Sequence, residues 1–260
     1  MIIRKSHDEI EQMARSGEVV AETLALIGEN ARPGVTTAAL DALAEEFIRS
    51  RGGVPTFKGY RGYPASICTS PNAMVVHGIP GPYALAEGDV LSVDVGVTLD
   101  GFVADSAYTF AIGEISPEAE RLLEVCQAAL AAGVDQCRPD NRLSDISHAI
   151  QTVTEEGGFS VVRALVGHGV GRSMHEDPQI PNYGPPGRGP ALAPGMVFAI
   201  EPMINAGAPD IVVHDDEWSI SSSDDSLSAH FEHTVAVTDD GPRILTESRI
   251  RARIGTHLLQ

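Results

Sequence analysis

The chain has 260 residues, 43% of them hydrophobic, and its 18 Lys and Arg against 36 Asp and Glu give a formal net charge of −18. That length and apolar content are enough for one large core or two ordinary ones. The negative charge repels phosphate backbones and anionic lipid headgroups, so tight binding to nucleic acid or to a membrane is disfavoured. No apolar run approaches the roughly 20 residues of a membrane-spanning helix, and the N-terminus is amphipathic, so we expect a cytoplasmic protein. The three cysteines, an odd number at irregular spacing, indicate neither a disulfide framework nor a thiolate zinc site.

The first fifty residues have the pattern of two helices. Ser6 and Glu9 form a capping-box pair, and apolar residues at helical spacing predict a helix over about 7–30. Thr36 can cap a second helix, which Gly52-Gly53 ends. Short strand-like runs follow in the segments ASICTS and AMVVHG.

The same order of elements recurs in the second half of the chain. Residues 117–137 and 143–156 are predicted helices. Strand-like runs follow in FSVVRAL, MVFAIEPMI, DIVVH and FEHTVAVT. Two helices followed by several strands, occurring twice, indicate two similar halves that face each other within a single domain, residues 1–260.

The stretch LSVDVGVTLDGFVADSAYTF, residues 91–110, alternates like buried β-structure but carries two aspartates, Asp94 and Asp105. LDG is a turn signal, so the stretch is predicted as a β-hairpin. One loop register pairs Asp105 with Gly96 and another pairs it with Asp94, and both put the two carboxylates on one face. Taken alone, the pattern favours a solvated face. On a half-buried face, two close carboxylates need a proton or a cation.

Further metal-ligating side chains occur where an ordinary polar residue is unexpected. The segment GHGVGRSMHEDP holds two histidines seven residues apart in a Gly-rich setting. Glu201 ends an apolar strand pattern, Glu232 lies between two histidines in SAHFEHTVAVT, and His77 ends the run AMVVH. The candidate side chains are His77, Asp94, Asp105, His168, His175, Glu201 and Glu232.

Together these residues predict a site for two divalent metal ions. Four carboxylates and one imidazole form a hard, oxygen-rich ligand set, which suits Mn, Fe, Co or Zn. The four carboxylates carry a charge of −4, which two divalent ions neutralise. Without metal the acids would repel one another strongly. A pair of ions bridged by carboxylates can supply hydroxide at neutral pH and polarise a carbonyl group.

Six longer motifs give a resemblance to a known enzyme family. They are YRGYPASICTSPNAMVVHGIP, SVDVGV, GFVADSAYTF, GHGVGRSMHEDP, IEPMI and SLSAHFEHTVAVT. With these motifs the chain resembles type I methionine aminopeptidases over nearly all of its length. The resemblance implies an α+β pita-bread fold, in which a pseudo-twofold, curved antiparallel sheet is backed by two helix pairs. It also implies removal of the initiator methionine from nascent proteins and peptides with a small second residue, by a hydroxide bound to two metal ions.

The resemblance also assigns roles to the candidate residues. The five metal ligands that it implies are Asp94, Asp105, His168, Glu201 and Glu232. Asp105 and Glu232 would bridge both ions. Asp94 would hold one ion, and His168 with Glu201 the other. Glu201 would also accept and relay the proton of the attacking water.

Two further histidines and an apolar pocket would bind the substrate. His77 would bind the peptide nitrogen, and His175 would stabilise the oxygen of the tetrahedral intermediate. The methionine pocket would be lined by Tyr60, Tyr63, Cys68 and Trp218. Polarizable sulfur and aromatic faces suit a thioether side chain. Met174 and Phe57 border the same pocket and depart from the aromatic residue and the cysteine that relatives commonly carry at these positions.

Two alternatives share much of this pattern. Xaa-Pro aminopeptidases and prolidases have the same five ligands, but the YRGYPASIC stretch and Trp218 favour methionine as the substrate side chain. A non-catalytic binding protein of the pita-bread fold would have lost metal ligands, whereas all five are intact here.

The partners follow from the same resemblance. We expect the substrates to be the N-termini of nascent polypeptides. The acidic surface weakens contact with ribosomal RNA, although the basic tail, residues 247–260, can help locally, so we expect ribosome association to be transient. We expect a monomer.

Overall fold

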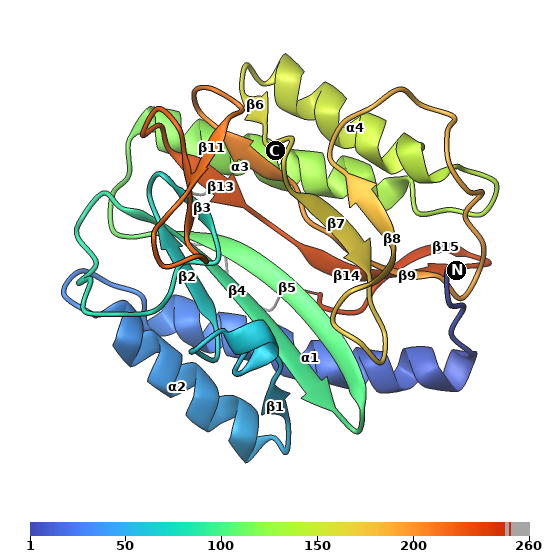
Figure 1. Cartoon of the computed structure of the whole chain (residues 1–260), viewed down its shortest axis with the longest axis horizontal. Helices are drawn as coiled ribbons and strands as arrows, with labels where there is room; N and C mark the ends of the chain where they lie inside the picture. Colours follow the sequence, from blue (N-terminus) through green and yellow to red (C-terminus); the bar gives the residue numbers. More distant parts are fainter. Residues whose placement is uncertain (248–249, 251–260) are drawn as a thin grey trace, which may run out of the picture.

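The computed structural model of the protein describes residues 1–247 and 250 (Figure 1). Most of the basic tail that was predicted to assist ribosome contact therefore lies outside the described residues. Within the described part of the chain the α-helices are α1 (His7–Asn30), α2 (Thr37–Ser50), α3 (Pro117–Asp135) and α4 (Leu143–Glu156). These are the four helices that the sequence predicts. No helix among the described residues is long and apolar enough to span a membrane.

The helix ends follow from local capping. The backbone N–H of Glu9 donates to Ser6 Oγ (3.3 Å) and the N–H of Ser6 donates back to the Glu9 carboxylate (3.0 Å), which confirms the capping box. Thr36 Oγ1 accepts from the backbone of Ala39 (3.2 Å). The helix α3 ends at Asp135, two residues earlier than predicted, because the N–H of Cys137 bonds three residues back in a tightened last turn.

The strands are short except for the central hairpin. In the first half they are β1 (Val54–Pro55), β2 (Cys68–Pro71), β3 (Met74–Val76), β4 (Val90–Leu99) and β5 (Phe102–Ala111), with a 3₁₀ turn at Tyr60–Gly62. In the second half they are β6 (Ser160–Val161), β7 (Val166–Gly169), β8 (Glu176–Pro181), β9 (Val197–Ile200), β10 (Met203–Asn205), β11 (Ile211–Val213), β12 (Ile220–Ser222), β13 (Ser228–His230), β14 (His233–Thr238) and β15 (Gly241–Ile244).

All of these strands pair in antiparallel fashion. The strand orders are β1-β4-β2 with β5 beside β4, β15-β14-β9-β7-β8, β13-β10-β6 and β11-β12-β3. The two halves are joined by the ladder between β3 and β12 and by a second junction between β5 and β14. At this second junction hydroxyl groups take the place of a regular ladder: Thr234 bonds both the N–H and the carbonyl of Asp105 (2.9 and 2.8 Å), and Thr109 donates to His230 O (2.8 Å). We call this junction the seam. It joins the two halves into one curved layer.

The central hairpin adopts the first of the two predicted registers. Leu99 pairs with Phe102, Gly96 with Asp105, and Asp94 stands one diagonal step away, opposite Ala107. Both aspartates share one face, as predicted. That face is not solvated, because Asp105 is only 3% exposed.

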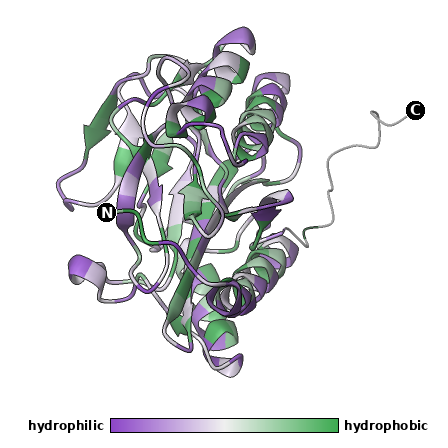
Figure 2. Ribbon diagram, turned by 90° about the vertical axis from the view of Figure 1, so that its right-hand side faces the viewer, coloured by the Kyte–Doolittle hydropathy of each residue, from purple (hydrophilic) through white to green (hydrophobic). Residues whose placement is uncertain are grey.

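Both helix pairs cover the same side of the curved layer. Figure 2 shows them on one side of the strands, with their apolar segments turned toward the sheet. α1 and α2 pack with β4 and β5 in one hydrophobic cluster, while α3 and α4 pack mainly against strands of the second half in another. The opposite, concave face is therefore free to carry a site. This arrangement confirms the predicted α+β pita-bread fold.

One predicted strand is interrupted at a glutamate, and another, FEHTVAVT, begins only after its glutamate. MVFAIEPMI forms β9 and β10 rather than one strand, because Pro202 after Glu201 lacks the N–H that a continuous ladder needs. Glu232 likewise lies in the gap between β13 and β14. The two gaps are opposite each other, since β9 pairs with β14 before the break and β10 with β13 after it. The layer bends there, and both glutamates lie on the bend.

Candidate active site

All thirteen residues that the sequence singles out line one cavity of about 290 Å³ on the concave face. They are Phe57, Tyr60, Tyr63, Cys68, His77, Asp94, Asp105, His168, Met174, His175, Glu201, Trp218 and Glu232. They come from both halves of the chain and from elements up to 175 residues apart (232 − 57). One end of the cavity is acidic and the other is aromatic and apolar.

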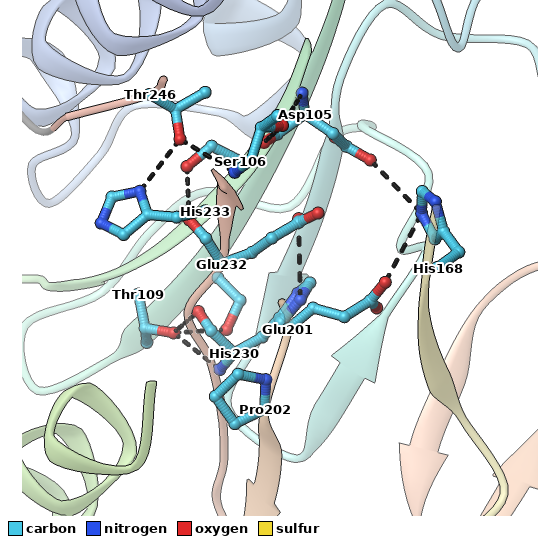
Figure 3. A network of polar contacts seen from close by, with 12 residues as sticks. Asp105, Ser106, Thr109, His168, Glu201, Pro202, His230, Glu232, His233 and Thr246 are labelled. Carbon is cyan, nitrogen blue, oxygen red and sulfur yellow. Dashed lines mark hydrogen bonds and ion pairs between the residues drawn. The ribbon is translucent and has the colours of Figure 1, made fainter. Parts of the chain in front are cut away.

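The acidic end has the geometry of a metal centre. The ligand atoms of Asp105 on β5, His168 on β7 and Glu232 at the strand break all lie within 4.8 Å of one another. His168 Nε2 is 3.8 Å from Asp105 Oδ2 and 3.5 Å from Glu201 Oε1 (Figure 3). Asp94 enters from β4, in contact with Asp105. One imidazole and four carboxylates therefore converge on one point.

The imidazole of His168 is oriented for coordination. Its Nδ1 lies 2.8 Å from the carbonyl oxygen of Gly169, which can only accept, so Nδ1 carries the proton. The unprotonated Nε2 then faces the carboxylates. Burial, followed by the nearby His175, lowers the pKa of His168 to about 4, so the ring is neutral at neutral pH. A neutral imidazole with its second nitrogen bonded to a carbonyl is the usual form of a histidine ligand.

The carboxylates cannot satisfy one another without a cation. Burial raises the pKa of Asp94 to about 7. Burial and then the neighbouring carboxylates raise the pKa values of Asp105, Glu201 and Glu232 well above their ordinary range. Oδ1 of both aspartates and Oε1 of Glu232 are enclosed and have no hydrogen-bond partner. Unpartnered buried carboxylate oxygens around an available imidazole suit divalent metal ions, which supply the missing positive charge.

Two further histidines stand at the rim of the cluster. His77 follows β3 in a left-handed conformation (φ 59°), and a Cβ on the next residue, Gly78, would overlap the carbonyl oxygen of Thr69, so glycine is required there. The ring of His175 lies 4.2 Å from that of His168, and its Nδ1 is 2.9 Å from Tyr60 Oη. Burial lowers the pKa of His77 to about 4 and that of His175 below its ordinary value. Both rings are neutral at neutral pH.

The far end of the cavity is an apolar slot. The side chains of Phe57, Tyr63, Cys68 and Met174 are at most 7% exposed. The ring of Trp218 closes the slot, 5.1 Å from the ring of Tyr63. Phe57 fits there only because its neighbour on β4 is Gly96, where a Cβ would lie 2.7 Å from the ring. Burial raises the pKa of the Cys68 thiol, which therefore stays protonated and uncharged. The slot thus offers aromatic faces and polarizable sulfur.

Sequence reasoning did not assign His230 to the site. This residue is 2% exposed, lines the cavity, and holds its Nε2 without a partner 4.0 Å from Glu232 Oε2. His233, on the other side of Glu232, points away and bonds Thr246 (3.0 Å; Figure 3). Strand alternation carries the missing signal, since residues two apart share a face and residues one apart do not. Arg61 also lines the cavity without having been predicted.

The sequence matches the model of one protein family, Metallopeptidase family M24, over residues 11–239. The chain belongs to this family. A family M24 peptidase acts through divalent metal, in agreement with the acidic cluster. Together with the relatives named below, this match confirms the resemblance inferred from the motifs.

Among curated M24 relatives, the methionine aminopeptidase of Clostridium perfringens is 52% identical over 246 residues, covering 95% of this chain and 99% of that protein. Methionine aminopeptidase 1 of Bacillus subtilis is 50% identical, with the same coverage. The crystal structure of methionine aminopeptidase from Thermotoga maritima superposes with a TM-score of 0.94 at 43% identity, covering 95% of this chain and all of that one. A prolidase from Pyrococcus furiosus reaches a TM-score of 0.74 at 20% identity, with 66% of its length covered, and shares the fold alone.

Proposed function

We propose that this M24 peptidase is a methionine aminopeptidase, which removes the initiator methionine from peptides and proteins with a small second residue. One observation carries the proposal: a metal-binding cluster and a closed aromatic slot are the two ends of a single cavity of about 290 Å³. A side chain in the slot places the carbonyl carbon that follows it beside the cluster. The near-complete match to relatives named methionine aminopeptidase supports the same substrate.

The proposed cofactor is a pair of divalent ions, drawn from Co, Mn, Fe and Zn, which all suit this donor set. The proposed ligands, which would hold the ions, are Asp94, Asp105, His168, Glu201 and Glu232. When bound, such a pair supplies a water that loses its proton near neutral pH and a Lewis acid for the carbonyl group. The free amine of the substrate is recognised on the Asp94 side of the cluster, which restricts cleavage to N-termini.

The side chains around the cluster handle the protons. Glu201 is the proposed general base, because its buried carboxylate faces the cluster, with Oε1 3.5 Å from His168 Nε2, and its raised pKa suits it to take up a proton. It takes the proton of the attacking water and passes it to the departing amine. His77, on the peptide side of the cavity, binds the nitrogen that leaves.

His175 is the proposed donor to the developing oxyanion. With the Tyr60 hydroxyl donating to Nδ1, the proton of the neutral imidazole stays on Nε2 and is available to the substrate oxygen. Donors placed in this way contribute about 3 kcal/mol to transition-state stabilisation.

The slot accounts for selection of methionine. An unbranched thioether fills a narrow space between aromatic rings and thiol or thioether sulfur, and each sulfur–aromatic contact adds about 0.3–1.5 kcal/mol. A charged side chain would be desolvated there without a partner. The two positions that differ from common relatives, Phe57 and Met174, are both buried in the wall, so they set the width of the slot.

We further propose that residues 1–260 act as a single cytoplasmic, monomeric domain that meets nascent chains at the ribosome transiently. The supporting feature is the net charge of −18, which weakens sustained contact with RNA.

The direct test compares hydrolysis of Met-Gly-Met and Gly-Pro after chelation and readdition of each candidate ion. We expect Met-Gly-Met to be cleaved only by metal-loaded protein and Gly-Pro to be left intact. Cleavage of Gly-Pro in preference would establish a prolidase-like enzyme. Retention of two ions without cleavage of either peptide would establish a binding protein.

A further inference from the structure

A buried ion pair lies outside the cavity and has no part in the mechanism above. Lys5 Nζ is 2.7 Å from Glu176 Oε2, and the two side chains are only 5% and 8% exposed. The residues are 171 positions apart in the chain. Charged side chains are this deeply buried only when each satisfies the other.

The other oxygen of Glu176 organises the loop that precedes it. Glu176 Oε1 accepts from the backbone N–H of Arg172 (2.9 Å) and of Ser173 (3.3 Å). The loop is packed too closely for a side chain at Gly171, where a Cβ would lie 2.5 Å from Lys5 Cε and 2.6 Å from Glu176 Oε1. One carboxylate thus closes the turn on one side and receives the lysine on the other.

This loop carries two residues of the site. Met174 lies in the wall of the slot and His175 reaches the rim of the metal cluster. His175 contacts Tyr60 and His168 by its ring, but the backbone from which it projects is fixed by the bonds to Glu176. The start of the loop is also held where the N–H of Val103 donates to Gly171 O (2.8 Å), so Glu176 holds the part of the loop that leads to Met174 and His175.

Lys5 is held in place independently of the loop. Its backbone N–H donates to Gly195 O (2.7 Å), its Nζ also donates to Ile3 O (3.2 Å), and the guanidinium of Arg4 donates to Pro194 O (2.7 Å). The first residues of the chain are thus anchored to the turn before β9. The ammonium group of Lys5 is therefore held in position next to Glu176 by contacts outside the loop.

We propose that Lys5 is a positioning residue: by its ion pair with Glu176 it fixes the loop of residues 171–176, and so sets where Met174 and His175 stand in the active site. The catalytic part of this inference rests on the proposed function. The structural part, that Lys5 orders the loop, does not.

The test uses the full metal-loaded chain with Lys5→Met, Lys5→Arg and the matched control Asp177→Asn. Asp177 is the next acid after Glu176 and pairs with the N-terminal amine of Met1, but it is 67% exposed. For Lys5→Met we expect kcat on Met-Gly-Met to fall about 10- to 100-fold, the effect of a small misplacement of catalytic groups, with metal content unchanged. Lys5→Arg should restore most of the rate, because it keeps the charge. Asp177→Asn should stay within about twofold of wild type.

A second measurement, amide hydrogen exchange, decides the structural part without any activity. In Lys5→Met the amides of Arg172 and Ser173 should exchange faster while the helices keep their protection. Unchanged exchange with an unchanged kcat would overturn the inference. So would uniformly faster exchange with loss of metal, since Lys5 would then be a general stabiliser. If the wild type fails to cleave methionine peptides, the proposed function fails, and the exchange comparison still tests the role of Lys5.

Discussion

The molecule contains buried carboxylates of two kinds: Glu176 beside the active site, and Asp105 and Glu232 inside it. Glu176 is satisfied by the protein itself, with a lysine on one oxygen and two backbone amides on the other. Asp105 and Glu232 each keep an enclosed oxygen without a partner. A buried carboxylate whose partners all come from the protein stabilises the fold. A buried carboxylate without such partners indicates a site where a cation binds.

The largest effect on activity should come from a substitution in the acidic cluster, whose carboxylates lack partners within the protein. Asp105→Asn keeps the shape of the side chain but removes one negative charge from the proposed bridge. We expect loss of metal occupancy together with a fall in kcat/KM that exceeds the ~100-fold cost of losing an outer-shell partner. Metal analysis and peptide hydrolysis on the same sample check this. An Asn variant with both ions and full turnover would remove the bridging assignment.

His175 stands between the two acidic groups, next to Glu176 in sequence and beside His168 in space. Because it is proposed to touch the substrate and not the metal, His175→Ala should lower kcat by about 100- to 1000-fold while metal content stays at the wild-type level. Steady-state kinetics with metal analysis separates this variant from Asp105→Asn. Near wild-type kcat would exclude the oxyanion role.

A smaller effect is expected at the apolar end of the cavity. Trp218→Ala opens the slot beside Tyr63 without touching either acidic group. We expect KM for Met-Gly-Met to rise about 10-fold, with kcat changed much less, because lost packing in a hydrophobic pocket is worth roughly 1–3 kcal/mol. A fall in kcat with unchanged KM would show that Trp218 acts on the reacting groups instead.

The smallest expected effect is a pH dependence of the stability of the metal-free protein. In metal-free protein the pKa of Asp94 is about 7, against an ordinary value of 3.8. The folded state then binds a proton that the unfolded state releases, so the contribution of Asp94 to stability is full below about pH 4 and is lost as the pH rises through about 7, at ~1.4 kcal/mol per pH unit for this one group. The raised pKa values of Asp105, Glu201 and Glu232 add to the loss in the same direction. Metal competes with protons, so loaded protein should lack this loss.

Calorimetry of chelated and metal-loaded samples between about pH 5 and pH 8 measures this linkage. The difference in Tm should widen with pH by several degrees, given ~2–4 °C per kcal/mol for a domain of this size. A constant difference would mean that Asp94 does not hold a proton in the metal-free state. The ion pair of Lys5 and Glu176 is complete without metal, so amide protection of Arg172 and Ser173 should survive chelation.

Local signals in the sequence were enough for the helices and the hairpin. Capping residues, helical spacing and the LDG turn are short-range patterns, and they give four helix positions and two possible registers of the hairpin, of which the structure adopts one. The candidate residues also meet in one cavity as expected, because motifs of the M24 family carry them.

Other features could not be derived from the sequence. The bends at Glu201 and Glu232 depend on two strand breaks facing each other across the sheet, and no local pattern reports that register. Lys5 reads as an ordinary surface lysine, because its partner is 171 residues away.

The seam has a consequence for how the two halves hold together. Asp94 and Asp105 belong to the first half, whereas His168, Glu201 and Glu232 belong to the second, and each half has its own helix pair and apolar cluster. Across the seam, hydroxyl-mediated bonds do the work of a ladder. The proposed ions would therefore link the two halves, in addition to the ladder of β3 with β12, so metal affinity and the cohesion of the halves are thermodynamically coupled.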